Sequence, residues 1–130
     1  MVQSLKSLNF IDSDIVADVM SKVDRADFTD SLPYDDNPTP FKIEKEAKLQ
    51  SPQQHAIALE LLKNNLIGKT RALDIGSGSG YLAVCMSLMM EGGFTYGIEN
   101  QDSLFKKAIE NIKKNHGELI DDGRTVIIRP

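Results

Sequence analysis

The fold of this sequence is decided by the stretch Leu73-Asp74-Ile75-Gly76-Ser77-Gly78-Ser79-Gly80. A short apolar run leads into three glycines that alternate with two serines, and a helical pattern follows. Because Gly76 and Gly78 lack a Cβ atom, the backbone can turn sharply there and approach a bound molecule closely. Gly80 permits close packing at the start of the helix. The stretch therefore predicts a strand, a ligand-binding turn and a helix.

From this turn onward, apolar strands alternate with helical patterns. The predicted strands cover residues 71–75, 94–99 and 125–129, and the predicted helices cover 80–90 and 102–115. The side chains expected to face inward from the last helix are Phe105, Ala108, Ile109 and Ile112. Strands separated by helices form a parallel sheet with right-handed crossovers, and ligands bind at the carboxyl ends of its strands. We therefore expect an α/β fold with the glycine turn at the ligand-binding edge.

Two helical patterns precede the sheet. The first can be capped by Asp12 or Ser13, and its apolar face consists of Ile15, Val16, Val19, Met20 and Val23. The second begins after Ser51, which forms an S-x-x-Q capping box with Gln54, and its expected apolar face consists of Ile57, Leu61 and Leu62. The segment over residues 29–42 is expected to be an extended loop, because it contains Pro33, Pro38 and Pro40.

The spacing of the glycines distinguishes between kinds of nucleotide-binding turn. A dinucleotide-binding turn, G-x-G-x-x-G, would carry its third glycine at the position of Tyr81, so this sequence misses that pattern by one residue. Asp74 stands two positions before the first glycine, as in the adenosylmethionine-binding loops of methyltransferases. Glu99 closes the next strand, where a carboxylate can accept both hydrogen bonds from a ribose diol. The pattern favours an adenosylmethionine site, with another nucleotide site or a structural turn as alternatives.

Composition limits the possible classes of protein. With 130 residues, of which 41% are hydrophobic and 26% charged, the chain fits one globular domain. The net charge of −4, with acidic and basic residues interleaved, argues against a nucleic-acid partner. The apolar runs fall short of the roughly 20 residues that span a membrane, and residues 1–10 lack the apolar core of a signal peptide. We therefore expect no membrane association.

Residues that suggest redox, metal or acid–base roles have simpler explanations. The single cysteine, Cys85, excludes an internal disulfide and fits a reducing compartment, so we expect a cytoplasmic protein. Cys85 lies on a helix that is apolar nearly all round, which indicates burial. His55 is expected to pack or to cap its helix, and His116 to interact with a helix end. Because no further histidine or cysteine stands at a metal-ligand spacing, we predict no metal.

Four segments resemble the protein-L-isoaspartate O-methyltransferase family in order and spacing. They are Val23-Asp24-Arg25-Ala26-Asp27-Phe28, Pro33-Tyr34, His55-Ala56-Ile57-Ala58-Leu59-Glu60-Leu61-Leu62 and Ala72-Leu73-Asp74-Ile75-Gly76-Ser77-Gly78-Ser79-Gly80-Tyr81. The resemblance implies a Rossmann-like class I methyltransferase fold, with S-adenosylmethionine as cofactor and S-adenosylhomocysteine as product. It also implies methyl esterification of the α-carboxylate of isoaspartyl residues in damaged proteins, which starts their repair.

The resemblance also implies roles for single residues. The expected cofactor-binding residues are Asp74, Gly76, Ser77, Gly78, Gly80, Tyr81 and Glu99. Asp74 would lie near the methionyl ammonium of the cofactor and Glu99 on its ribose, whereas Tyr81 suits either the cofactor or the core. The reaction needs no general base, because a carboxylate with a pKa of roughly 4 is already an anion at neutral pH.

The sequence departs from the family just before His55. Where the family shows T-I-S-x-P-H, this chain has Lys48-Leu49-Gln50-Ser51-Pro52-Gln53, and only the proline keeps its place. Ser51 is the candidate for the catalytic serine through a one-residue shift, but a helix cap explains it without function. Glu44, Lys45 and Glu46 also occupy a stretch that is largely uncharged in the family. Substrate recognition is therefore expected to be altered or lost.

The family continues well beyond Pro130, so the resemblance implies an incomplete sheet of about three strands. Residues 1–66 would form a helical, substrate-side segment, and residues 67–130 the first half of the cofactor-binding domain. The strand over residues 71–75 would lack a neighbour on one side, and such an edge invites self-association. Two functional hypotheses follow: a methyltransferase acting on isoaspartyl proteins, or a catalytically inactive binding module of the same fold.

Overall fold

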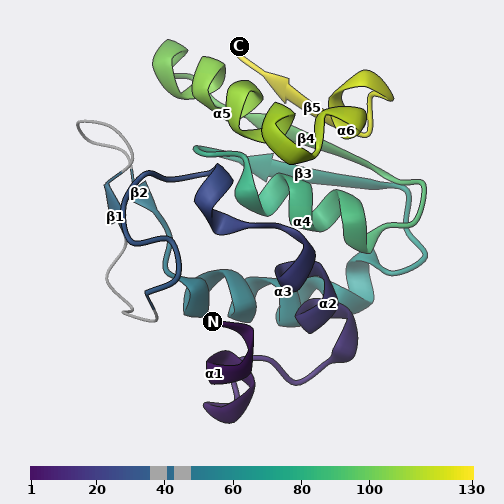
Figure 1. The fold of residues 1–130 in the computed structure, drawn as a ribbon. Coiled ribbons are helices and arrows are strands. Elements are labelled where there is room, and N and C mark those ends of the chain that lie inside the picture. Colours follow the sequence, from purple (N-terminus) through teal and green to yellow (C-terminus); the bar gives the residue numbers. More distant parts are fainter. Residues whose placement is uncertain (36–40, 43–47) are drawn as a thin grey trace.

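A computed structural model describes residues 1–35, 41–42 and 48–130 of the chain (Figure 1). The fold is α/β, with a parallel three-stranded sheet in the order β3-β4-β5 and a small antiparallel pair, β1-β2. The helices are α1 (Val2–Ser7), α2 (Asp14–Lys22), α3 (Pro52–Leu66), α4 (Tyr81–Met89), α5 (Asp102–Asn115) and α6 (Gly117–Asp121). The strands are β1 (Phe41–Lys42), β2 (Lys48–Leu49), β3 (Arg71–Ile75), β4 (Phe94–Ile98) and β5 (Thr125–Ile128).

The parallel sheet follows the predicted alternation of strands and helices. β3 pairs with β4 and β4 pairs with β5, both in parallel, so β3 lies at one edge of the sheet. The bounds of β3 and α5 agree with the prediction residue for residue. The side chains predicted to face inward from α5 are buried or packed against the core, namely Phe105, Ala108, Ile109 and Ile112.

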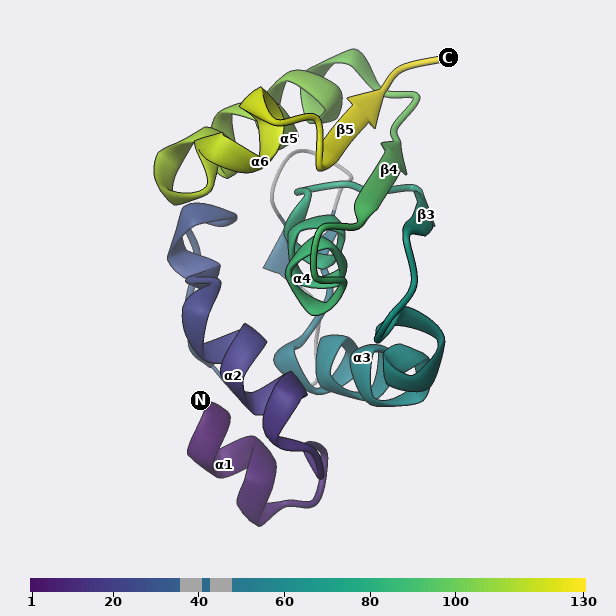
Figure 2. The ribbon, with the colours of Figure 1, turned by 90° about the vertical axis from the view of Figure 1, so that its right-hand side faces the viewer.

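One face of the parallel sheet is covered and the other is bare. α4, α5 and α6 all lie on the same side of the three strands (Figure 2). Within the described residues, the opposite face exposes the apolar side chains of Leu73, Ile75, Phe94, Tyr96 and Ile128. The exposed fraction reaches 77% at Ile75. Because a parallel sheet is ordinarily buried on both faces, this bare face is a surface suited to association.

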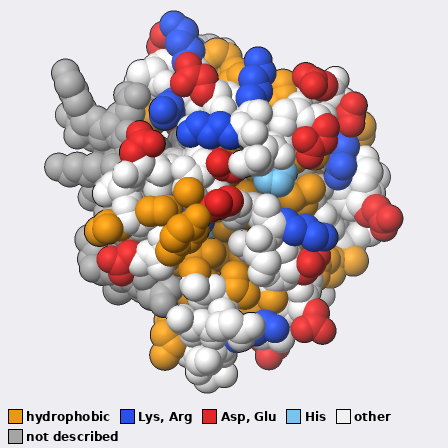
Figure 3. Space-filling model, viewed as in Figure 1, with side chains coloured by type: hydrophobic (Ala, Val, Ile, Leu, Met, Phe, Trp, Pro, Cys, Tyr) orange, Lys and Arg blue, Asp and Glu red, His pale blue; other side chains and the backbone are white. Residues whose placement is uncertain are grey.

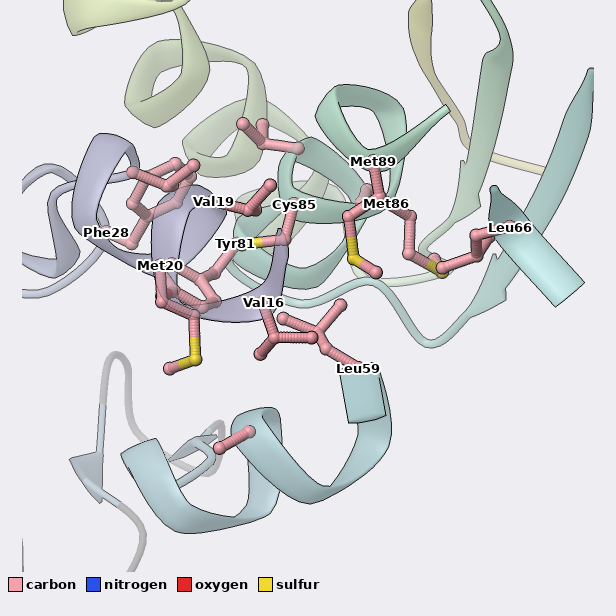
Figure 4. Close-up of a cluster of buried hydrophobic side chains, with 14 of the residues drawn as sticks. Val16, Val19, Met20, Phe28, Leu59, Leu66, Tyr81, Cys85, Met86 and Met89 are labelled. Carbon is pink, nitrogen blue, oxygen red and sulfur yellow. The ribbon is translucent and has the colours of Figure 1, made fainter. Parts of the chain in front are cut away.

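The hydrophobic core lies between α2, α3 and α4 (Figure 4). Val16 and Met20 come from α2, Leu59 from α3, and Tyr81 and Cys85 from α4, and each is at most 1% exposed. Burial raises the pKa of the Cys85 thiol to about 12, so this group stays protonated. The predicted burial of Cys85 is confirmed. The core joins residues from both of the predicted segments, 1–66 and 67–130.

The predicted caps of α2 and α3 are confirmed. The Ser13 hydroxyl caps α2 by accepting a backbone hydrogen bond from the first turn. Ser51 and Gln54 form the predicted capping box at the start of α3. Glu60 of α3 accepts hydrogen bonds from the N–H groups of Asp12 and Ser13, both at 2.8 Å. This carboxylate therefore joins α3 to the start of α2.

The predicted apolar face of α3 is wrong. Ile57, Leu61 and Leu62 are 43%, 75% and 37% exposed, whereas Ala56 and Leu59 are completely buried. Apolar residues occur on several sides of this helix, so their spacing does not select the side that packs against α2 and α4. The observed face is set by tertiary packing, since α3 contacts both of those helices.

Several short features of the structure were not predicted, among them the 3-10 helix η1 (Arg25–Asp27). α1 and α6 contain six and five residues, too few to give a periodic pattern. β1 begins at Phe41, inside the segment expected to be an extended loop, and pairs with β2. The loop prediction is confirmed over residues 29–35, which form neither helix nor strand. Pro38, Pro40 and the charged stretch 44–46 lie outside the described residues.

Charged side chains of both signs are interspersed on the face of the molecule shown in Figure 3. Among the described residues, none of the helices combines the length and the apolar character that crossing a membrane requires. The same part of the chain contains no group of three or more His, Cys, Asp or Glu side chains that is placed to hold a metal ion.

Candidate cofactor-binding site

The glycine turn joins the end of β3 to the start of α4. Gly76, Gly78 and Gly80 have positive φ angles of 79°, 51° and 90°, which side-chain-bearing residues rarely adopt. The N–H groups of Gly76 and Ser77 donate to the Ile98 carbonyl at 2.8 and 3.0 Å. The turn is therefore held against the carboxyl end of β4.

α5 supports the glycine turn from behind. A Cβ atom on Gly80 would lie 3.1 Å from Cδ1 of Ile112, which confirms the predicted close packing at the start of α4. Asn111 is 1% exposed, and its Nδ2 donates to the Ser79 carbonyl at 3.2 Å. Sequence reasoning missed Asn111, although its position three residues after the inward-facing Ala108 places it on the inward side of α5.

A cavity of about 200 Å³ opens beside the turn. Four of the predicted cofactor-binding residues line it, namely Asp74, Gly76, Ser77 and Gly78. Part of the remaining lining comes from residues near the start of α3, including Gln50 and His55. The structure therefore brings the glycine turn together with the segment in which the sequence departs from the family that it resembles.

A larger hollow of about 880 Å³ lies elsewhere, beside Lys22, Lys69 and Arg124. Lys69 and Arg124 closely precede β3 and β5, so this hollow borders the amino ends of the strands. Ligands of open parallel sheets bind at the carboxyl ends, and only the smaller cavity contains Asp74 and the glycine turn. We therefore place the candidate site in the smaller cavity.

Asp74 gives this cavity its electrostatic character. Its Oδ2 atom is buried and has no hydrogen-bond partner among the described residues. Burial, together with the nearby carboxylate of Glu99, raises the pKa of Asp74 to about 6. A positively charged group entering the cavity would stabilise the ionised form of Asp74. The cavity is thus suited to a cationic ligand.

Glu99 was predicted to be the last residue of its strand, but β4 ends at Ile98, so Glu99 lies directly after it and does not line the cavity. The side chain is 5% exposed, and its two oxygens accept hydrogen bonds from the N–H groups of Gly78 and Gln101, both at 3.0 Å. Because each carboxylate oxygen has a second lone pair, Glu99 can brace the turn and still accept a hydrogen bond from a ligand hydroxyl.

Tyr81 and Ser51 also lie outside the cavity lining. Tyr81 is fully buried, and its ring meets Phe28 edge-on with 5.4 Å between centroids (Figure 4). Tyr81 thus occupies the core, which is the second of the two places that the sequence allows. The Ser51 hydroxyl accepts a hydrogen bond from the N–H of Gln54 at 3.3 Å, so it serves as a helix cap.

Arg25 belongs to the surroundings of the cavity, although sequence reasoning assigned it no role. Its guanidinium donates to the carbonyls of Pro33 and Gln50, both at 2.9 Å, and to Nδ1 of His55 at 2.8 Å. His55 stacks on Tyr81 with 4.6 Å between centroids, which confirms its predicted packing role. Burial, and then the charge of Arg25, lower the pKa of His55 to about 3, so its ring is neutral.

Known proteins resemble the chain closely in sequence. A family model described as protein-L-isoaspartate(D-aspartate) O-methyltransferase (PCMT) matches residues 1–129. A protein-L-isoaspartate O-methyltransferase of Caenorhabditis elegans is 39% identical over 129 residues, which are 98% of this chain and 56% of that protein. One from Triticum aestivum is 39% identical over 127 residues, with 95% and 54% covered. The chain spans about half the length of these relatives.

The fold matches as well. A Plasmodium falciparum protein, assigned as a protein-L-isoaspartate O-methyltransferase and crystallised with S-adenosyl-L-homocysteine, superposes with a TM-score of 0.92 at 36% identity. The match covers 99% of this chain and 61% of that one. The expected methyltransferase fold and the family resemblance are both confirmed. On the match over residues 1–129, the chain belongs to the protein-L-isoaspartate(D-aspartate) O-methyltransferase family.

Proposed function

We propose that this chain binds S-adenosylmethionine at the glycine turn and serves methyl transfer to the α-carboxylate of isoaspartyl residues in damaged proteins. The observation that carries the proposal is the unpartnered carboxylate oxygen of Asp74 in a cavity lined by Gly76, Ser77 and Gly78. The relatives that match almost the whole chain are named protein-L-isoaspartate O-methyltransferases, which supports the same reaction.

The residues of the cavity fit this cofactor in charge. Asp74 has a raised pKa because it is buried and lies near Glu99, and none of the ion pairs among the described residues supplies a cation to either acid. S-adenosylmethionine carries two cationic groups, an ammonium and a sulfonium, and either relieves the repulsion between the acids. A Cβ atom placed on Gly76 would meet nothing within 4 Å, so a ligand has room against the backbone there.

The cavity is large enough for only part of the cofactor. Ligand cavities commonly measure about 300 to 1,000 Å³, and this cavity measures about 200 Å³. We assign the amino-acid end of the cofactor to the cavity, with its ammonium at Asp74 and its body along Gly76, Ser77 and Gly78. Glu99 is the proposed acceptor for the ribose hydroxyls, while Gly80 and Tyr81 support the turn from the start of α4.

The proposed chemistry asks the protein for orientation rather than for proton transfer. When bound, the cofactor supplies an electrophilic methyl group on its sulfonium. The isoaspartyl carboxylate is an anion at neutral pH and can attack without a general base. The protein must hold the carboxylate in line with the methyl group, and such positioning can lower a barrier by about 7 to 11 kcal/mol.

The reaction is tested with a methyl-labelled cofactor and two peptides that differ only in an isoaspartyl or an aspartyl residue. We expect this chain to transfer label to the isoaspartyl peptide alone, as a base-labile ester. Asp74→Asn should abolish transfer, because it removes the charge proposed to bind the ammonium. Binding of the cofactor without transfer by the unmodified chain would favour the second hypothesis, a binding module of the same fold.

A further inference from the structure

Arg25 is a buried cation without a carboxylate partner among the described residues. Its side chain is 0% exposed, and none of the ion pairs found in that part of the chain includes it. A charge in this position is costly unless hydrogen bonds replace its hydration. Arg25 forms three such bonds and lies over the ring of Tyr81, 5.2 Å from its centroid. Two of the three acceptors belong to Gln50 and His55, which line the cavity.

The hydrogen bond to His55 determines which imidazole nitrogen carries the proton. A guanidinium has donors only, so Nδ1 of His55 must accept the hydrogen bond from Arg25 at 2.8 Å. The neutral ring therefore carries its proton on Nε2. Because His55 lines the cavity, its Nε2–H is the donor that this ring can offer to a ligand there.

The other two hydrogen bonds hold backbone near the cavity. Nη2 of Arg25 donates to the Gln50 carbonyl, just before α3, and Nε donates to the Pro33 carbonyl in the loop after residue 28. One side chain thus connects three segments that lie apart in the sequence. A planar guanidinium can serve three acceptors in fixed directions, whereas the ammonium of a lysine cannot reproduce that geometry.

We propose that Arg25 is a positioning residue, which fixes the Nε2–H tautomer of His55 and the carbonyl of Gln50. Through these two groups Arg25 sets the affinity of the cavity for a ligand carboxylate, although Arg25 itself does not touch the ligand. Asp74 offers a charge to the ammonium of an amino-acid ligand, and His55 offers a donor to its carboxylate. The affinity part of this inference rests on the proposed function, because S-adenosylhomocysteine supplies the amino-acid group. The tautomer part does not.

The tautomer is measured by long-range 1H–15N NMR of the imidazoles in the full chain, with His116→Gln used to assign the two rings. We expect a single Nε2–H form of His55 in the unmodified chain and a mixture of tautomers in Arg25→Met. Arg25→Lys keeps a hydrogen-bond donor, so it should retain more of the Nε2–H form than Arg25→Met does. Arg124→Met is the matched control, because Arg124 donates to the carbonyls of Ser87 and Met90 rather than to the cavity.

The same variants are then titrated with S-adenosylhomocysteine. Arg25→Met should weaken binding about tenfold, as expected for one lost hydrogen bond to a charged group, and Arg25→Lys should weaken it less. Arg124→Met should bind as the unmodified chain does. The proposal is overturned if His55 carries its proton on Nδ1, or if folded Arg25→Met binds with unchanged affinity.

Two further outcomes separate this inference from the proposed function. If circular dichroism shows that Arg25→Met does not fold, the tautomer and the affinity are compared between Arg25→Lys and the unmodified chain. Lysine keeps the charge of Arg25 but not its three-way hydrogen-bond geometry. If the unmodified chain does not bind S-adenosylhomocysteine, the proposed function fails. The tautomer comparison then still decides whether Arg25 positions His55.

Discussion

Asp74 and Glu99 lie at the carboxyl ends of neighbouring strands, and each has a separate task in the structure. Glu99 is committed to the backbone through Gly78 and Gln101, whereas Asp74 leaves one buried oxygen free of described partners. Burial, and then the nearby charge of Glu99, disfavour the ionised form of Asp74. The site therefore holds an acid whose charge state a ligand can change.

This arrangement predicts that ligand affinity depends on pH. The pKa of Asp74 is raised to about 6, so the group takes up a proton as the pH falls through that value and loses the charge that an ammonium requires. The affinity for S-adenosylhomocysteine should therefore fall about tenfold between pH 7 and pH 5. Calorimetric titration at the two pH values checks this. Asp74→Asn should bind weakly at both, and a pH-independent affinity in the unmodified chain would contradict the assignment.

At the scale of elements, α2 and α3 are joined by the carboxylate of Glu60. Burial raises the pKa of this group, but hydrogen bonds from Ser13, Lys63 and Asp12 outweigh it and lower the pKa to about 2. The contribution to stability is therefore present above the ordinary pKa of 4.5 and is lost as the pH falls towards 2.

Replacing Glu60 should loosen the packing of these two helices. Glu60→Ala removes hydrogen bonds to a charged, 15% exposed side chain, and we expect the free energy of unfolding to fall by about 2 kcal/mol at pH 7. Urea denaturation measures the loss. Glu110→Ala, on the exposed side of α5, is the control and should change stability by less than about 0.5 kcal/mol. Equal effects of the two changes would show that Glu60 does not join the helices.

β4 also controls the glycine turn through Gly97. A Cβ atom there would lie 2.8 Å from Cδ1 of Ile127 and 2.9 Å from Cβ of Ser77, closer than such atoms normally approach. Gly97→Ala should therefore displace Ser77, lower stability by about 1 to 3 kcal/mol and weaken binding of S-adenosylhomocysteine. Gly117→Ala meets no atom within 4 Å and should leave binding unchanged. Thermal unfolding and titration of both variants check this, and normal binding by Gly97→Ala would argue against the close contact.

The elements that were predicted correctly are those specified by local sequence. The glycine turn, the capping box of Ser51 and the inward face of α5 each depend on residues a few positions apart. The apolar side of α3 was predicted wrongly because several sides of that helix are apolar, and packing against α2 and α4 makes the choice.

In the candidate site, too, local sequence predicts some of the residues and not others. Asp74, Gly76, Ser77 and Gly78 are consecutive or nearly so, and the sequence identifies them as one group that lines the cavity. The link between Arg25 and the cavity could not be predicted, because its partners Gln50 and His55 lie 25 and 30 residues away. Contacts of this kind exist only once the chain has folded.

At the scale of the whole molecule, the main feature is the bare face of the parallel sheet. Leu73 and Phe94 are 56% and 39% exposed on this face, and β3 has no further strand paired with its outer edge among the described residues. Apolar patches of this kind and unpaired strand edges both favour association. We therefore expect copies of the chain to associate through this face.

Sedimentation velocity over a range of concentrations tests the expected association. The mean mass should rise with concentration in the unmodified chain, and Leu73→Glu combined with Phe94→Glu should suppress the rise by placing charges on the face. Leu8→Glu combined with Leu61→Glu, at positions that are 59% and 75% exposed elsewhere, provides the matched control and should still associate. A monomer at every concentration would contradict the expectation.

The most direct test of the central claim is calorimetric titration of the purified chain with S-adenosylhomocysteine, with NAD as the control ligand. If the glycine turn and its two carboxylates form the cofactor site, the unmodified chain binds S-adenosylhomocysteine but not NAD, and an Asp74→Ala, Glu99→Ala double variant that remains folded does not bind it. Absence of binding by the unmodified chain, or unchanged binding by the double variant, would contradict the assignment of the site.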